Sequence, residues 1–330
     1  MKNALIQTIA LAFALLLPLG SGCDRGVNVS GTAPGPKTLR IAVIPKGTSH
    51  VFWKSVEAGA KKAGEELGVE VIWKGPLLED DRAEEIKVVE QFVAEGVDGI
   101  VLAPLDYEAL ARPVASAMAR NIPVVIFDSA LKGEAGKDFV SFVATNNKKG
   151  GQMGGEQLAK LLGGKGKVVL LRYSVGSAST DERESGFLEV MKANPGIEVI
   201  VDNRYAGATL ATAKDEAMKL VDQLKIADGI FCPNESSTLG MLGALKDNNL
   251  AGKVKFVGFD ATPALVDALK AGQINALVAQ DPTRMGYLGV KTVVAKIKGE
   301  KVDPMVDTGV RLITPESLSD PEIRKFLNLE

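Results

Sequence analysis

The sequence predicts an α/β fold of two similar lobes, and the main observation is a strand-like segment that occurs twice. The apolar run 122–127 ends at Asp128, and the run 255–259 ends at Asp260, about 130 positions later. Short apolar runs rich in β-branched residues are typical of buried parallel strands, whose carboxyl ends open onto the ligand crevice of α/β sheets. The two Asp residues are therefore candidate ligand-binding groups, one from each lobe.

Two further pairs of segments repeat with nearly the same offset. Segments 97–104 and 227–234 both contain Asp-Gly-Ile, and segments 38–45 and 165–172 are strand-like runs, with offsets again of about 130 positions. The chain has 330 residues, 46% of them apolar, so each copy is large enough to bury its own core. This arrangement predicts a ligand site between two lobes.

Composition argues against several classes of partner and chemistry. The formal net charge is −2, which gives no electrostatic reason to expect nucleic acid as a partner. The chain has one histidine and two cysteines, and no cluster has the spacing of a metal site or of a nucleophile beside a base. We expect no metal, no cofactor and no catalytic residue. Asp128 and Asp260 could act as a glycosidase pair only if their separation suited that chemistry.

The amino terminus predicts export. A lysine precedes the apolar run 4–19, and small residues then lead to Cys23, which is the layout of a signal peptide over 1–22. The run resembles a bacterial lipoprotein signal, which implies that Cys23 is lipidated; plain secretion is the alternative. Residues 23–37 contain several Gly and Pro and are expected to be a flexible tether. Cys232, in an apolar strand, is expected to be a small core residue.

Two adjacent aromatic residues stand at the start of the first predicted helix. Phe52 and Trp53 follow the loop 45–50, so they lie just beyond the carboxyl end of a strand. Neighbouring side chains on a helix point in different directions, and we expect at least one ring to face the crevice. An aromatic face there would suit the C–H groups of a sugar. Packing into the core is the alternative for either ring.

A second group of residues is placed by helix-start signals. Ser179 and Glu182 have the spacing of a capping box, which would put Arg183 in the first turn of a helix near the crevice mouth. A solvated surface charge is the alternative for Arg183. The glycines within 150–155 match no phosphate-binding motif and indicate close helix packing.

The residues after the second copy of the repeated strand also suggest that Asp260 binds a ligand. Thr262 and Pro263 have the pattern of an N-cap and a first helical residue. With Thr262 as the N-cap, Asp260 would not be needed to cap the helix and could bind a ligand.

Six motifs have an order and spacing that are typical of one family: 41–60, 122–128, 176–187, 233–235, 257–263 and 279–282. They resemble the periplasmic monosaccharide-binding proteins of the ribose-binding type, and the resemblance runs from about Leu39 to Ile313. It implies the type I periplasmic binding protein fold, with two Rossmann-like lobes of parallel strands and three hinge crossings. The implied lobes are 38–144 plus 281–308 (N-terminal) and 145–280 plus 309–330 (C-terminal).

The resemblance also implies a set of sugar contacts. Aromatic rings would flank the sugar, and polar groups would bond its hydroxyls, because carboxylates accept hydrogen bonds, the Arg fork donates them and amides do both. The implied ligand-binding residues are His50, Phe52, Trp53, Asp128, Arg183, Asn234, Asp260 and Gln280.

Four positions depart from the family pattern. His50 and Ala103 stand where Asn is usual, Ser129 where Arg is usual, and Ala208 where an aromatic residue is usual. The loss of an aromatic ring and a long Arg predicts an enlarged pocket. It favours a larger or differently oriented polyol, or a ligand that is not an ordinary sugar.

The expected function is that of a monomeric, membrane-anchored lipoprotein on the extracytoplasmic face, which captures a monosaccharide or polyol and delivers it to an ABC transporter permease. The alternative is a sensor protein that presents a ligand to a membrane receptor. A sugar-responsive transcription regulator would need a DNA-binding head where this chain has a signal peptide. An enzyme on the same fold is disfavoured by the composition above.

Overall fold

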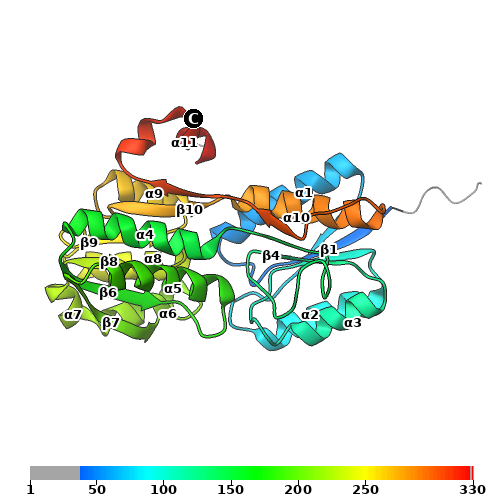
Figure 1. Ribbon diagram of the computed structural model, residues 1–330, viewed down its shortest axis with the longest axis horizontal. Coiled ribbons are helices and arrows are strands. Elements are labelled where there is room, and N and C mark those ends of the chain that lie inside the picture. The colour runs from blue at the N-terminus through cyan, green and yellow to red at the C-terminus, as the bar shows by residue number, and fades with distance from the viewer. Residues whose placement is uncertain (1–37, 328, 330) are drawn as a thin grey trace, which may run out of the picture. The chain divides into compact units, whose positions relative to one another are not determined.

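Two six-stranded sheets organise the residues that the computed structural model describes, which are 38–327 and 329 (Figure 1). The predictions for residues 1–37 (the signal peptide, the tether and lipidation at Cys23) lie outside the described residues. Within the described part of the chain, no helix combines the length and the hydropathy needed to cross a membrane.

The first sheet is entirely parallel, with the strand order β11-β5-β4-β3-β1-β2. Its apolar faces are covered by two helix pairs, α1 with α10 on one side and α2 with α3 on the other. The elements are β1 (Arg40–Ile44), α1 (Val51–Leu67), β2 (Glu70–Trp73), α2 (Arg82–Glu95), β3 (Gly99–Leu102), α3 (Ala111–Ala119), β4 (Val124–Phe127), β5 (Ser141–Ala144), α10 (Pro282–Ile297) and β11 (Met305–Asp307).

The second sheet has the equivalent order β12-β10-β9-β8-β6-β7, with only β12 antiparallel among its described strands. Helices α4 and α5 cover one face, and α6 to α9 cover the other. The elements are α4 (Asn147–Leu162), β6 (Gly166–Arg172), α5 (Ala178–Ala193), β7 (Ile197–Tyr205), α6 (Leu210–Met218), α7 (Val221–Ile226), β8 (Gly229–Phe231), α8 (Glu235–Asp247), β9 (Lys255–Phe259), α9 (Pro263–Lys270), β10 (Ala276–Gln280), β12 (Val310–Ile313), η1 (Glu316–Ser319) and α11 (Pro321–Phe326).

The predicted duplication is confirmed by the matching strand orders of the two sheets. It extends to the backbone, because Asp128 and Asp260 both have a left-handed conformation, with φ of 62° and 70°. Asp tolerates this conformation better than most residues with a Cβ. The chain passes between the sheets after β5, β10 and β11, as the predicted three crossings require.

Two of the glycines of α4, Gly151 and Gly155, pack against the neighbouring helix α5, as predicted, while Gly150 and Gly154 face phenylalanine rings of the sheet. A Cβ at Gly151 would lie 1.9 Å from the carbonyl oxygen of Arg183 in α5. The first lobe repeats this device, because a Cβ at Gly59 of α1 would lie 1.9 Å from the carbonyl oxygen of Thr283 in α10. The close approach of α4 and α5 fixes the backbone that carries Arg183.

The structure also corrects some element predictions. The sequence pattern predicts one helix over 209–224, but the segment forms two helices with a break at Lys219 and Leu220. It predicts a strand over 197–201, but β7 continues to Tyr205. The short strand β11 was not predicted. It has three residues, two of them exposed, so no apolar run marks it in the sequence. Cys232 is fully buried in the core, as expected.

Candidate functional site

All eight predicted ligand-binding side chains line one cavity of about 30 Å³, at the carboxyl ends of strands from both sheets. These are His50, Phe52, Trp53, Asp128, Arg183, Asn234, Asp260 and Gln280. Six further side chains that were not predicted line the same cavity: Lys46, Glu79, Tyr173, Ser179, Thr180 and Glu235. Among the described residues, no group of His, Cys, Asp and Glu side chains is arranged to hold a metal ion.

Asp128 follows β4 and forms a buried ion pair with Lys46, which follows β1. The Lys46 Nζ lies 3.2 Å from the Asp128 Oδ2, and both side chains are almost fully buried. The ammonium group also donates to the Oγ atoms of Ser179 (3.0 Å) and Ser177 (3.4 Å) in the second lobe. A buried charge needs such partners, because desolvation of an unpaired ammonium is costly. Its position at a strand end, like that of Asp128, is the signal that could have identified Lys46.

His50 and Glu79 form a second buried ion pair. The His50 Nδ1 lies 2.6 Å from the Glu79 Oε1, which also accepts from the Trp53 Nε1 at 2.6 Å. The Tyr173 hydroxyl of the second lobe donates to the Glu79 Oε2 at 2.7 Å. Burial alone would raise the pKa of Glu79, but the bond and charge of His50 lower it to about 2. Burial would lower the pKa of His50, but Glu79 raises it to about 9, so both groups are charged at neutral pH.

The two aromatic rings at the start of α1 both line the cavity. Trp53 is 2% exposed and packs edge-on against Phe127, with the ring centres 6.1 Å apart, so most of its surface belongs to the core. Phe52 lies edge-on to Trp53 at 4.9 Å and is only half-buried. Of the two rings, Phe52 therefore has more surface available to a ligand.

Arg183 is buried, so the surface-charge interpretation is wrong. Its three donor nitrogens bond to the Asn147 Oδ1 (2.9 Å), the Pro233 carbonyl oxygen (3.0 Å) and the Gln280 Oε1 (2.8 Å). The guanidinium also lies 4.0 Å from the centre of the Phe259 ring. Burial lowers the pKa of Arg183, while the carboxylates of Asp260 and Asp128 oppose the change.

The predicted capping box at Ser179 is wrong. Helix α5 begins at Ala178 with Ser177 as N-cap, and no side-chain bond caps it at that residue. Arg183 therefore lies in the second turn of α5. The Ser179 Oγ accepts from Lys46 of the first lobe instead, a contact that no local sequence pattern records.

Asp260 is not free of structural duties, which corrects the second capping prediction. Its Oδ2 accepts from the backbone N–H of Glu235, the first residue of α8, at 2.8 Å, and its Oδ1 accepts from the Gln280 Nε2 at 2.8 Å. Thr262 is the N-cap residue of α9, but it makes no side-chain capping bond. Burial raises the pKa of Asp260 to about 6, although Arg183 and Gln280 oppose the change.

Asn234 is the N-cap of α8, so its amide has a structural role in addition to its place at the cavity. Its Oδ1 accepts from the backbone N–H of Ser237 at 3.2 Å, in a reciprocal capping box. Its Nδ2 donates to the Ser236 Oγ at 3.1 Å.

The predicted enlargement of the pocket is not seen. Ala103 and Ala208 are buried, but long side chains such as Lys46 and Glu79 fill the space between the lobes. The remaining cavity of about 30 Å³ is far below the roughly 300 Å³ or more that is usual for small-molecule pockets. A sugar therefore does not fit this cavity as it stands, and its lining must move to admit one.

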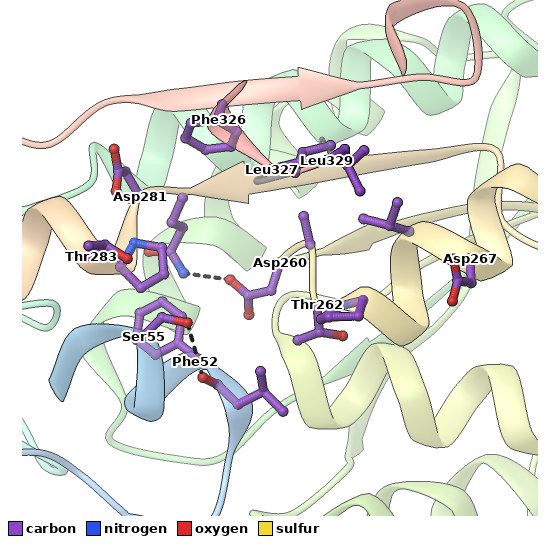
Figure 2. A pocket seen from close by; sticks show the side chains of 16 residues that line it. Phe52, Ser55, Asp260, Thr262, Asp267, Asp281, Thr283, Phe326, Leu327 and Leu329 are labelled. Carbon is purple, nitrogen blue, oxygen red and sulfur yellow. Dashed lines mark hydrogen bonds between the residues drawn. The ribbon is translucent and has the colours of Figure 1, made fainter. Parts of the chain in front are cut away.

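A second cavity of about 460 Å³ adjoins the first and shares Phe52, Asp260 and Gln280 with it (Figure 2). Its lining includes the apolar carboxyl-terminal residues Phe326, Leu327 and Leu329. The buried ion pairs lie at the smaller cavity, which is why we take that one as the candidate site.

Known proteins are similar to this chain along most of its length. The family model described as a periplasmic binding protein domain matches residues 41–301. The ribose import binding protein of Haemophilus influenzae is 31% identical over 303 residues, which cover 91% of this chain and 99% of that protein.

Solved structures are similar as well. A carbohydrate transporter solute-binding protein from Agrobacterium radiobacter, in complex with D-arabinose, is 37% identical with a TM-score of 0.84, covering 88% of this chain and 99% of that one. An ABC transporter solute-binding protein from Agrobacterium vitis with bound D-fucose is 34% identical with a TM-score of 0.83, covering 86% and 98%.

Proposed function

The chain belongs to the periplasmic binding protein domain family, and from this premise we propose that it captures a sugar or polyol outside the cytoplasm and delivers it to an ABC transporter permease. The observation that carries the proposal is the meeting of Asp128 and Asp260, one from each lobe, at a single buried cavity beside Phe52. A ligand that contacts both lobes favours the arrangement in which they are closed. The relatives described above are binding proteins, which supports a role without catalysis.

The charges around the cavity argue against an anionic ligand. Three basic side chains, Lys46, His50 and Arg183, face four acidic ones, Glu79, Asp128, Glu235 and Asp260. An anionic ligand would need an excess of positive charge, which this lining does not supply. Sugar hydroxyls both donate and accept, so they can replace the existing bonds between charged side chains without leaving a buried charge unpaired.

Lobe separation would use the three chain crossings as hinges, with 38–144 plus 281–308 and 145–280 plus 309–330 as the moving bodies. Two of these crossings lie side by side, because the Thr145 Oγ1 is 3.4 Å from the Thr308 Oγ1 and 3.4 Å from the Gly309 carbonyl oxygen. Lipid anchoring at Cys23, the monomeric state and a place on the extracytoplasmic membrane face complete the proposal.

A thermal-shift screen of the purified protein tests this function. The panel contains D-ribose, D-allose, D-arabinose, D-fucose and a set of polyols. A ligand at a hundredfold excess over its Kd stabilises the folded protein by roughly 2.7 kcal/mol, which raises Tm measurably. A flat response to every sugar and polyol would contradict the proposal.

Variants then test the site. Asp128→Asn and Asp260→Asn each remove a charged acceptor, and we expect binding of the active sugar to weaken about 10-fold to 100-fold by calorimetry. Asp202→Asn, on the exposed surface of β7, is the matched control and should bind normally. Normal binding by both site variants would place the ligand elsewhere.

A further inference from the structure

Two of the helices that begin at the cavity, α1 in one lobe and α5 in the other, have no side-chain cap at their N-cap residue. The N-cap residue of α1 is His50, which makes no side-chain capping bond, and the first turn of α1 contains no acidic residue. The N-cap residue of α5, Ser177, likewise makes no side-chain capping bond. The first N–H groups of a helix have no partner within the helix, so they need one from elsewhere.

For α1 that partner comes from the second lobe. The Glu235 carboxylate accepts from the backbone N–H of Val51 at 3.2 Å and from that of Phe52 at 2.9 Å. Glu235 is the first residue of α8 and is 5% exposed. Its carboxylate lies where the positive end of the α1 dipole favours a negative charge. Its backbone N–H is held by Asp260, so the capping group is itself fixed by a residue of the candidate site.

For α5 the partner comes from the first lobe. The backbone N–H of Ser179, the second residue of α5, donates to the Ser129 Oγ at 3.1 Å. Ser129 is fully buried and directly follows Asp128. The family resemblance implies an Arg at this position, and in this chain the Ser129 hydroxyl instead accepts a hydrogen bond from the opposite lobe.

We infer that Glu235 and Ser129 are positioning residues that cap α1 and α5 across the cleft, so that each lobe completes the ligand-facing helix of the other when the lobes close. The capped ends carry Phe52 and Trp53 on α1, and α5 carries Arg183 in its second turn. Closure thereby fixes the groups that are proposed to surround the ligand. The part of this inference that concerns the ligand rests on the proposed function; the capping itself does not.

Helix α6 provides a contrast. It is capped within its own lobe, where the Thr209 Oγ1 accepts from the backbone N–H of Thr212 at 3.1 Å. Loss of such a cap destabilises one lobe whether the cleft is open or closed. Loss of Glu235 or Ser129 instead removes bonds that exist only when the lobes are together, so it changes the ratio of closed to open protein.

Single-molecule energy transfer measures this ratio directly, in the absence of any sugar. Dyes are attached at Lys87→Cys on α2 and Lys225→Cys on α7, which lie in different lobes and have exposed side chains. The labelled protein carries Cys23→Ser, and the remaining Cys232 is fully buried and therefore protected from labelling. Each distance population is integrated to give the closed-to-open ratio.

We expect Glu235→Ala and Ser129→Ala each to lower the closed-to-open ratio about fivefold. This is the change in an equilibrium constant that corresponds to the loss of a typical N-cap hydrogen bond. The double variant should lower the ratio by about the product, because the two caps lie on different helices. Glu235→Gln retains one acceptor oxygen and should recover part of the loss. Thr209→Ala, the matched control, should lower Tm and leave the ratio unchanged.

Three results would overturn the inference: an unchanged ratio in both alanine variants, an equal decrease in Thr209→Ala, or a parent protein with no closed population. Because no sugar is added, these results do not depend on the proposed function. If the variants change the closed-to-open ratio as expected but no sugar raises Tm in the screen, the capping inference stands and the proposed sugar-binding function is contradicted.

Discussion

The ion pair between His50 and Glu79 predicts a raised pKa for His50, which can be measured at that single residue. His50 is the only histidine in the sequence, so its ring signals in an untagged protein need no assignment. Burial would lower its pKa, yet the carboxylates of Glu79 and Glu235 raise it to about 9. We expect a proton NMR titration of the ring to show its midpoint near pH 9 and to show a charged ring at neutral pH.

Glu79→Gln removes the negative partner and leaves a side chain of similar shape. In the folded parent, the pKa of His50 is raised from 6.5 to about 9. A shift of this size corresponds to about 3 kcal/mol of stability. This stabilisation is fully present below pH 6.5 and is lost as the pH rises through 9, since the raised pKa belongs to the folded state. The variant lacks it at every pH.

The same interaction acts on Glu79, whose pKa is lowered from 4.5 to about 2. Its contribution is therefore present above pH 4.5 and is lost as the pH falls through 2. The two shifts describe one pair and are counted once. Between about pH 4.5 and 6.5 the parent should exceed Glu79→Gln in free energy of unfolding by about 3 kcal/mol, or more where the unpaired ring disturbs the fold.

The assay combines urea unfolding at several pH values with the NMR titration. In Glu79→Gln, burial acts without its main opposing charge, and the His50 midpoint should fall by two pH units or more. Glu198→Gln makes the same charge change on the exposed surface of β7 and should leave the midpoint in place. A parent midpoint near pH 6.5, or a midpoint that Glu79→Gln does not move, would refute the reasoning.

Three further changes test other parts of the structure. Gly151→Ala places a Cβ 1.9 Å from the Arg183 carbonyl oxygen and should lower the free energy of unfolding in urea by about 3 kcal/mol, while Gly243→Ala, beside a flexible Lys side chain, should cost under about 1 kcal/mol. Burial raises the pKa of Glu85 to about 8, so its ionisation destabilises the fold as the pH rises from 4.5 to 8. The difference in free energy of unfolding between Glu85→Gln and the parent should therefore be up to about 4 kcal/mol more favourable to the variant at pH 8 than at pH 4.5. An equal difference at both pH values would contradict this. Cys23→Ser should move the protein from the membrane fraction to the soluble fraction, and unchanged partitioning would exclude a lipid anchor at this residue.

The duplicated fold could be predicted from the sequence because its signals are local. Each buried parallel strand is a short apolar run, and the polar residue that follows it necessarily lies at the carboxyl edge of the sheet. Asp128, Asp260 and Gln280 were found in this way or through their motifs, and they do line one cavity. Whether they bind the ligand stays a prediction. The close packing of α4 could also be predicted from its glycines, since small residues at helical spacing indicate close helix packing.

The hydrogen-bond partners of these residues were decided by the tertiary structure alone. Lys46 bonds Ser179, Glu235 caps α1 and Tyr173 bonds Glu79, and in each case the two residues come from different lobes and lie far apart in the sequence. The capping box expected at Ser179 failed for the same reason, because its hydroxyl serves a lysine of the opposite lobe. A local pattern specifies which backbone groups need a partner. Only the packing of the two lobes specifies which side chain reaches them, because that choice depends on distances between segments that no sequence spacing encodes.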